Sequence, residues 1–170
     1  MVEMHLAAVR VEQPTNTPVV LLEEVGGSRR TLPIFIGTAE ASSIAYALQG
    51  VIPPRPLTHD LLLNIVALLG ATVERVVVTD LHMSANGSSG TYFAELHLLQ
   101  GGEARTISSR PSDALALAVR LGIPIFANDD LLDEAGVVIE NDDDDDTPPE
   151  ELVSQFRQFI EGINPEDFSR

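Results

Sequence analysis

Several residue types that carry chemistry or anchor a chain are absent or scarce in this sequence. It contains no cysteine and no tryptophan, and aromatic residues make up 5% of the chain. Without cysteine, disulfide bonds, thiolate metal sites and cysteine nucleophiles are excluded. No apolar run is long enough to span a bilayer, and residues 1–6 lack the basic and apolar regions of a signal peptide. We therefore expect a cytoplasmic protein that does not cross a membrane.

Cations are also scarce. The chain has 10 Lys and Arg residues against 26 Asp and Glu residues, and its formal net charge is −16. A net negative charge repels a polyanion, which argues against a simple nucleic-acid binder. The charge is uneven, because five consecutive aspartates occupy residues 142–146 and more acidic residues follow. This acidic run predicts a solvated linker rather than a calcium loop, since it lacks the glycine and spaced ligands of such a loop.

The pattern of apolar residues, glycines and prolines predicts an α+β fold. We expect a single domain over residues 1–138, with mainly antiparallel strands and three or four packed helices. Strands are predicted at 4–12, 19–25, 31–36, 72–81, 91–99, 104–108 and 124–127. Helices are predicted at 37–50, 58–69, 112–121 and 129–135. Residues 139–149 are predicted to be the acidic linker and residues 150–170 a C-terminal helix or tail.

Two of the predicted helices carry apolar side chains in excess of what one domain needs. The helix at 58–69 is apolar around much of its circumference, which indicates burial on more than one side and predicts a homo-oligomer. The tail has Leu152, Phe156 and Phe159 at helical spacing, so it is expected to dock on the body or on a protein partner. The sequence does not show whether the tail docks on the body or on a protein partner.

Two proline-led helix starts gather the most reactive polar residues. Three prolines at 53, 54 and 56 stiffen the approach to Thr58, which is predicted to cap the second helix. This junction also delivers Arg55, His59 and Asp60. A similar junction lies about fifty residues later, with the sequence Arg110-Pro111-Ser112-Asp113. We expect the two junctions to meet and to form one polar site.

Each residue at the first junction has a chemical and a structural interpretation. His59 has an ordinary pKa near neutrality and could act as a general acid or base. Asp60 could orient it or bind a metal, or it could simply favour the dipole of the helix. Arg55 could hold a phosphate, or it could form a salt bridge to Glu40 or Asp113 that pins the loop.

The second junction offers the same choice. Arg110 precedes a helix N-terminus, where backbone N–H groups also favour anions, so it is a candidate phosphate ligand together with Ser112. Asp113 is a candidate catalytic carboxylate. Both Ser112 and Asp113 are also good residues for capping a helix, and for them we favour this simpler interpretation.

Carboxylates elsewhere could complete a site for a divalent metal such as Mg²⁺ or Mn²⁺. Mg²⁺ uses few carboxylates, together with water and substrate phosphate. The candidate ligands are Glu40, Asp60, Asp80 and Asp113, and Glu40 is also a candidate catalytic residue. The alternatives are that Glu40 is a first-turn acid and Asp80 a strand-end residue.

Several short motifs, taken together, resemble the bifunctional nuclease domain family. They are Leu32-Pro33-Ile34-Phe35-Ile36-Gly37, Glu40-Ala41, Pro54-Arg55-Pro56-Leu57-Thr58-His59-Asp60-Leu61-Leu62, Leu69-Gly70-Ala71, Thr79-Asp80-Leu81, Gly90-Thr91-Tyr92-Phe93-Ala94 and Arg110-Pro111-Ser112-Asp113-Ala114-Leu115-Ala116-Leu117-Ala118. The resemblance covers residues 2–136. It implies a nuclease that hydrolyses phosphodiester bonds in RNA and DNA with little sequence preference.

One departure and two alternatives remain open. Members of the family usually carry Asp two residues before the Arg of the Arg-Pro-Ser-Asp motif, and here that residue is Ser108. If the family's Asp is a base or a metal ligand, this chain is weakened there. The first alternative is a non-catalytic, oligomeric binding or regulatory protein whose arginine–carboxylate pairs are structural. The second is a small anionic ligand, such as a nucleotide, at Arg110.

Overall fold

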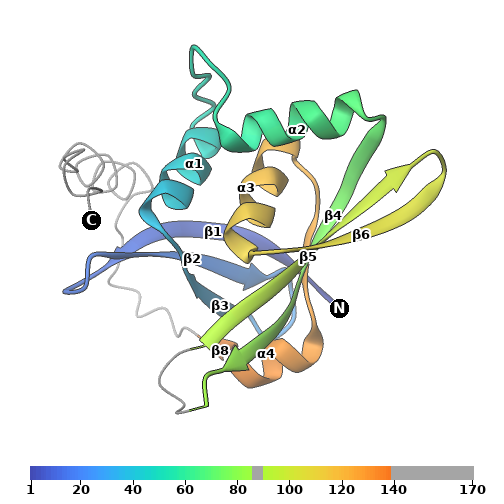
Figure 1. The fold of residues 1–170 in the computed structure, drawn as a ribbon. Helices are drawn as coiled ribbons and strands as arrows, with labels where there is room; N and C mark the ends of the chain where they lie inside the picture. The colour runs from blue at the N-terminus through green and yellow to red at the C-terminus, as the bar shows by residue number, and fades with distance from the viewer. Residues whose placement is uncertain (86–89, 139–170) are drawn as a thin grey trace.

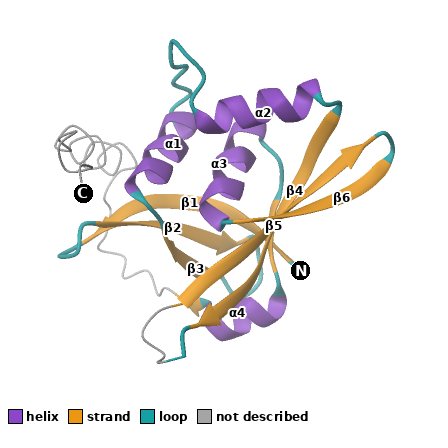
Figure 2. Cartoon of the chain, in the orientation of Figure 1, coloured by secondary structure: helices purple, strands orange, loops and turns teal. Residues whose placement is uncertain are grey.

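The computed structural model describes residues 1–85 and 90–138. The predicted linker and tail, 139–149 and 150–170, lie outside the described residues. In chain order the elements are β1 (Val2–Glu12), β2 (Thr17–Glu24), β3 (Arg30–Phe35), α1 (Thr38–Leu48), α2 (Thr58–Leu68), β4 (Ala71–Met83), β5 (Gly90–Gln100), β6 (Glu103–Ser109), α3 (Pro111–Leu121), β7 (Ile125–Ala127), α4 (Asp129–Ala135) and β8 (Val137–Val138). The α+β prediction is confirmed, and the predicted strands and helices match these elements closely (Figures 1 and 2).

The strands form one sheet with the order β6-β5-β4-β7-β1-β2-β3-β8. The first three strands make one antiparallel meander and β4, β5 and β6 make another. The short β7 joins them, because it pairs parallel with β4 on one side and antiparallel with β1 on the other. The parallel pairing requires a crossover, and α3 lies within the connection between β4 and β7.

Three helices cover one part of the sheet. Helix α3 packs on α1, α2, β4 and β5, and its buried stripe of alanines and leucines allows this close approach (Figure 1). Helix α1 packs on α3 and β2, whereas α4 packs on β3 and β4 at the end of the molecule away from α2. The core is aliphatic and includes the fully buried Leu22, Leu32, Ile44 and Leu115.

Two local predictions are corrected or refined by the structure. Leu57, not Thr58, is the N-cap of α2, and Asp60 Oδ2 accepts a hydrogen bond of 2.8 Å from the Leu57 backbone N–H. Asp60 therefore satisfies the backbone N–H of the N-cap residue, and Thr58 does not cap the helix. Pro33 lies inside β3, but β8 pairs only with Arg30 and Thr31, so this side of β3 is unpaired at Pro33 as proline requires.

Candidate functional site

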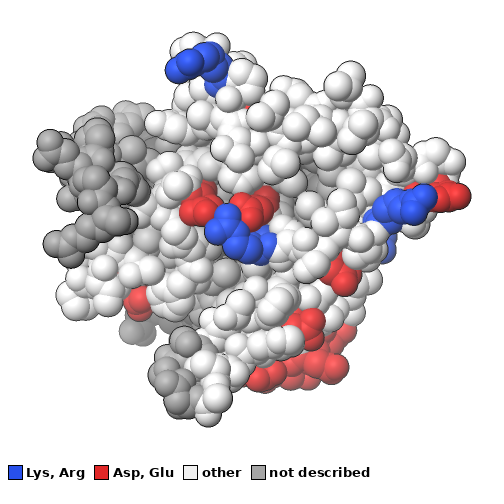
Figure 3. Space-filling model, in the orientation of Figure 1, with Lys and Arg blue, Asp and Glu red and all other residues white. Residues whose placement is uncertain are grey.

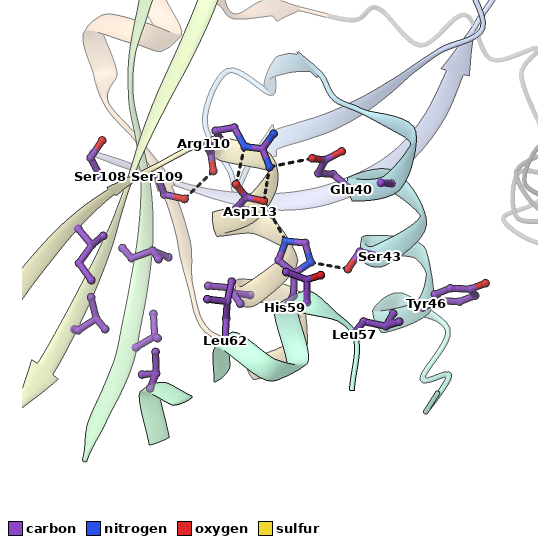
Figure 4. A pocket seen from close by; sticks show the side chains of 18 of the residues that line it. Glu40, Ser43, Tyr46, Leu57, His59, Leu62, Ser108, Ser109, Arg110 and Asp113 are labelled. Carbon is purple, nitrogen blue, oxygen red and sulfur yellow. Dashed lines mark hydrogen bonds and ion pairs between the residues drawn. The ribbon is translucent and has the colours of Figure 1, made fainter. Parts of the chain in front are cut away.

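The two proline-led junctions meet, as the sequence predicts, at the mouth of a cavity of about 850 Å³. The cavity lies between α1, α2 and α3 on one side and β4, β5 and β6 on the other (Figure 4). Much of its lining is aliphatic and includes Leu62, Val73 and Leu98. Its mouth is polar, because Glu40, His59, Arg110 and Asp113 lie there. The site therefore combines a small ionic group with an apolar chamber.

Asp113 is the centre of this ionic group. It lies in the first turn of α3, and Arg110 is the N-cap of the same helix. The Arg110 guanidinium donates to both carboxylate oxygens, with Nε–Oδ2 at 2.7 Å and Nη2–Oδ1 at 3.0 Å. The same Nη2 lies 2.9 Å from Glu40 Oε1 in the first turn of α1. One arginine thus joins the starts of two helices, in the bidentate geometry that makes such pairs strong.

His59 connects this group to the interior. Its side chain is 7% exposed, and it is the one buried residue of α2. Its Nε2 lies 3.1 Å from Asp113 Oδ1, and its Nδ1 lies 2.8 Å from Ser43 Oγ. In Figure 4 these two contacts hold the ring between α1 and α3. The ring is therefore fixed in orientation and reaches the cavity through Asp113.

A second ion pair lies behind the first. Arg120, in the last turn of α3, donates from Nε to Asp60 Oδ1 at 2.6 Å and from Nη2 to Ser43 Oγ at 2.9 Å. Arginine has no acceptor, so Ser43 accepts this bond and keeps its hydroxyl proton for His59 Nδ1. This assigns the proton of neutral His59 to Nε2, where it is donated to Asp113. The chain of contacts runs without a break from Asp60 through Arg120, Ser43 and His59 to Asp113.

These hydrogen-bond partners shift the pKa values of the two aspartates and of Arg110. The hydrogen bond from Arg120 holds the pKa of Asp60 below its ordinary value, and the Leu57 N–H and His59 act in the same direction. Burial works to raise the pKa of Asp113, but hydrogen bonds from Arg110 and His59 outweigh it and hold that pKa below its ordinary value. The hydrogen bond to Asp113 raises the pKa of Arg110. Both aspartates are therefore ionised near neutral pH.

The other candidate residues lie apart from this group. Arg55 is exposed, is absent from the cavity lining, and makes no hydrogen bond or ion pair with a residue that the structure describes. The alternative salt bridge from Arg55 to Glu40 or Asp113 is thus wrong, since Arg110 takes both carboxylates. Asp80 lies exposed in β4, opposite Phe93. Ser112 is buried beneath Arg110 and lines a smaller hollow on the other side of it.

Sequence reasoning missed Ser43 and Arg120. Ser43 is a buried polar residue within an otherwise small and apolar face of α1, between Ala41 and Ala45. That exception to the pattern was the available signal, because buried hydroxyls require partners. In the sequence, Arg120 has the pattern of an ordinary cation in the last turn of a helix, where cations are common. Nothing in its immediate neighbours indicates that it reaches another helix.

The comparisons with known proteins agree with the motifs quoted above. The sequence model of the bifunctional nuclease domain matches residues 20–140. This chain belongs to the bifunctional nuclease domain family. An uncharacterized protein of Mycobacterium tuberculosis is 40% identical over 171 residues, which cover 99% of this chain and 98% of that protein. This alignment spans nearly the whole of both chains.

Plant members of the bifunctional nuclease domain family are longer. Bifunctional nuclease 1 of Arabidopsis thaliana is 33% identical over 128 residues, which cover 73% of this chain and 38% of that protein. Bifunctional nuclease 1 of Oryza sativa subsp. japonica is 27% identical over 130 residues, which cover 75% of this chain and 38% of that protein. The match thus concerns one part of each plant protein.

The family departure at Ser108 falls at the cavity. Ser108 and Ser109 line its mouth beside Arg110, at the end of β6 (Figure 4). Ser109 Oγ donates 3.0 Å to the Arg110 carbonyl and so turns toward the backbone. The family resemblance leads to the expectation of an aspartate at this position, and this chain presents the exposed hydroxyl of Ser108 instead. Any base or metal ligand at this position is therefore missing here.

The donor groups at the mouth do not fit a resident metal ion. Within residues 1–85 and 90–138, no three His, Asp or Glu side chains are placed to hold one. Glu40 and Asp113 are both turned to the Arg110 guanidinium, and Asp60 is turned to Arg120. A divalent cation would have to replace a guanidinium that already neutralises these oxygens.

Within residues 1–85 and 90–138, no helix is long and apolar enough to cross a membrane.

The lowered aspartate pKa values predict a loss of stability in acid. A carboxyl group with a depressed pKa in the folded state stabilises the fold above its ordinary pKa and loses this contribution as pH falls through the folded value. We therefore expect the melting temperature to stay level from pH 7 to about pH 5 and to fall below about pH 4. Melting curves of wild type and Asp60→Asn would measure this.

The Asp60→Asn variant should melt lower at pH 7 and show a shallower acid dependence. Asp80→Asn is the matched control, because Asp80 is an exposed carboxylate outside the network. It should leave the acid dependence unchanged. Equal slopes for wild type and Asp60→Asn would contradict the prediction.

Proposed function

We propose that this protein is a nuclease that hydrolyses phosphodiester bonds in RNA and DNA at the mouth of the cavity. The observation that carries the proposal is the Arg110–Asp113–His59 group at the edge of an apolar chamber. Membership of the bifunctional nuclease domain family supports the same reaction class. The names of the plant relatives and the polar group at the cavity mouth both support the proposal.

In this proposal Arg110 binds the scissile phosphate. Its side chain is 67% exposed, so it can leave Glu40 and Asp113 for a stronger anion without being drawn from the interior. The N-terminus of α3 supports the same phosphate, since its first backbone N–H groups favour anions. As negative charge builds on the phosphoryl oxygens in the transition state, the guanidinium stabilises it.

Asp113 then positions the attacking water. When Arg110 turns to the phosphate, Asp113 keeps one hydrogen bond, from His59 Nε2, and has an oxygen free toward the cavity. His59 lines the cavity, but both of its ring nitrogens are bonded, so it acts on the proton of the attacking water through Asp113. Ser43 and Arg120 hold the ring in the tautomer that donates to Asp113. Glu40 lies across Arg110 from Asp113 and returns the guanidinium to its resting place after release.

The apolar chamber accounts for a low sequence preference. Its aliphatic wall contacts a base through van der Waals forces and offers few hydrogen-bonding groups to read base edges. A single-stranded or unpaired nucleotide would fit this wall better than a duplex. The net charge of −16 predicts weak binding with a shallow dependence on salt, because few cations meet the backbone and few counterions are released. Arg55 would contact a more distant phosphate, since it lies outside the cavity.

The test is hydrolysis of end-labelled RNA and DNA by highly purified protein, with and without a chelator. We expect cleavage of single strands that persists in the chelator, because the site carboxylates are occupied by Arg110. Activity that is lost in the chelator and restored by Mg²⁺ or Mn²⁺ would mean that an ion enters when Arg110 moves to phosphate. No cleavage under either condition would overturn the proposal.

The non-catalytic alternative is favoured by one observation. Both nitrogens of His59 already have partners, and Asp60, Asp113 and Glu40 are each paired with an arginine. A fully satisfied network of this kind can serve to fix three helices in one arrangement. It would then be a structural element of an oligomeric binding protein. The His59 variant described in the Discussion separates the two functions.

A further inference from the structure

Helix α2 presents an apolar stripe to solvent. The stripe consists of five side chains with exposed fractions of 42% to 86%: Leu61, Leu62, Ile65, Leu68 and Leu69. Their positions, i, i+1, i+4, i+7 and i+8, fall on one face of a helix. This is the pattern by which a helix normally buries itself against a core. Here it points away from the core of its own chain.

The part of the helix that is buried in the body is its polar first turn, whereas the side chains of the stripe are exposed. His59 is its one buried residue, and Asp60 ties it to Arg120. An isolated helix of eleven residues is marginal in water, so it requires an apolar contact for most of its stability. The described chain leaves the largest part of that contact unmade.

The stripe is also free of charge. The ionisable side chains of α2 are His59 and Asp60, and both are held inside the network. In Figure 3 the surface over α2 is white, while acidic side chains gather elsewhere on the same face. A chain with a net charge of −16 repels its own copies, and a neutral face is where this repulsion is weakest. Interface cores are likewise apolar and poor in charged residues.

We propose that two copies of this chain associate through α2, with the stripe of one copy packed against the stripe of the other. The contact is isologous, because the same five side chains serve both partners. Their exposed fractions together equal about three whole aliphatic side chains from each copy. Leu62 also lines the cavity, as does Ile107, which is 52% exposed, so the apolar surface continues to the cavity mouth.

A second copy fits this face better than the chain's own tail. The apolar tail residues, such as Phe156 and Phe159, stand among acidic residues that include Glu150, Glu151 and Glu161. An acidic segment would be stabilised by cations around its groove. The stripe supplies none, whereas an identical neutral stripe matches it. The proposal does not depend on the reaction at the cavity.

The first experiment is sedimentation velocity of the full chain over a range of concentrations. One chain has a mass of 18.3 kDa, and we expect a species of twice that mass. Ile65→Asp should shift it to the monomer without changing the far-ultraviolet circular dichroism. Val25→Asp is the matched control, because Val25 is 53% exposed and lies after β2, outside the stripe. It should leave the dimer intact.

The second experiment uses the absence of native cysteine. Ile65→Cys places a single thiol in the middle of the stripe, and a short bis-maleimide should link two such chains but not two Val25→Cys chains. A monomeric wild type, or a dimer that Ile65→Asp leaves intact, would overturn the proposal. So would a monomer in which the thiol at position 65 is protected until Phe156 and Phe159 are changed to Asp, because the tail would then cover the stripe.

Discussion

Replacing His59 by glutamine is expected to reduce phosphodiester hydrolysis by about 10²- to 10⁴-fold, the usual loss when a positioned acid–base group is removed. Glutamine is close in size and can keep one of the two hydrogen bonds of the ring, to Ser43 or to Asp113. The loss should fall on kcat with little change in KM, since His59 is buried and acts through Asp113. Initial rates on labelled single-stranded RNA and DNA would measure it.

His82→Gln is the matched control for this prediction. His82 is exposed on β4, packs beside Phe93 with ring centroids 4.5 Å apart, and lies outside the cavity lining. It should retain full activity. Arg110→Ala should raise KM as well as lower kcat, because it removes the proposed phosphate ligand and the charge that stabilises the transition state. If His59→Gln keeps wild-type kcat but melts at a lower temperature, the network is structural and the nuclease assignment of His59 fails.

Replacing Arg120 by methionine is expected to cost about 3 kcal/mol of the free energy of unfolding, the range for breaking a buried ion pair by removing one partner. Methionine fills much of the space of the arginine stem but leaves Asp60 unpaired. The side chain of Arg120 is 10% exposed, and it also bonds Ser43 and the Ala116 carbonyl. For a chain of this length the melting temperature should fall by about 10 °C. Thermal and urea denaturation would measure both quantities.

Arg55→Ala provides the contrast. Arg55 is exposed and unpartnered within the described residues, so its removal should change stability by less than about 0.5 kcal/mol. The sequence leaves open whether Arg55 holds a phosphate or forms a stabilising salt bridge, and the structure shows such a salt bridge at Arg120 instead. The Arg120→Met and Asp60→Asn double variant should be less destabilised than the sum of the two single variants. Additive losses would contradict the pairing.

Most of the helices and strands could be predicted from the sequence, because they are short and are bounded by glycines, prolines and turns. Gly50, Gly70 and Gly122, all with positive φ, follow the three main helices, and the strands alternate or run apolar between turns. The sheet order was not readable. Nothing in residues 125–127 states that this strand lies between β4 and β1, since that placement depends on how α3 crosses the sheet.

The site was only partly readable, for a related reason. His59, Arg110, Asp113 and Glu40 stand at helix starts, where proline and capping patterns draw attention to them. Arg55 has the same local pattern as Arg110, and only the path of the loop separates an exposed side chain from a paired one. Contacts between helices, such as Arg120 with Asp60 sixty residues away, leave no trace in local sequence.

The three-residue strand β7 has a mechanical consequence. It is the seam that joins the half-sheet of β1, β2, β3 and β8 to the half-sheet of β4, β5 and β6. Helix α1 follows the first half-sheet along the chain, while the apolar wall of the cavity belongs to the second. The strand pairing between the two half-sheets therefore passes through Ile125, Phe126 and Ala127, while α4 packs on both half-sheets. Amide exchange at these three residues would therefore report how firmly the two half-sheets are joined.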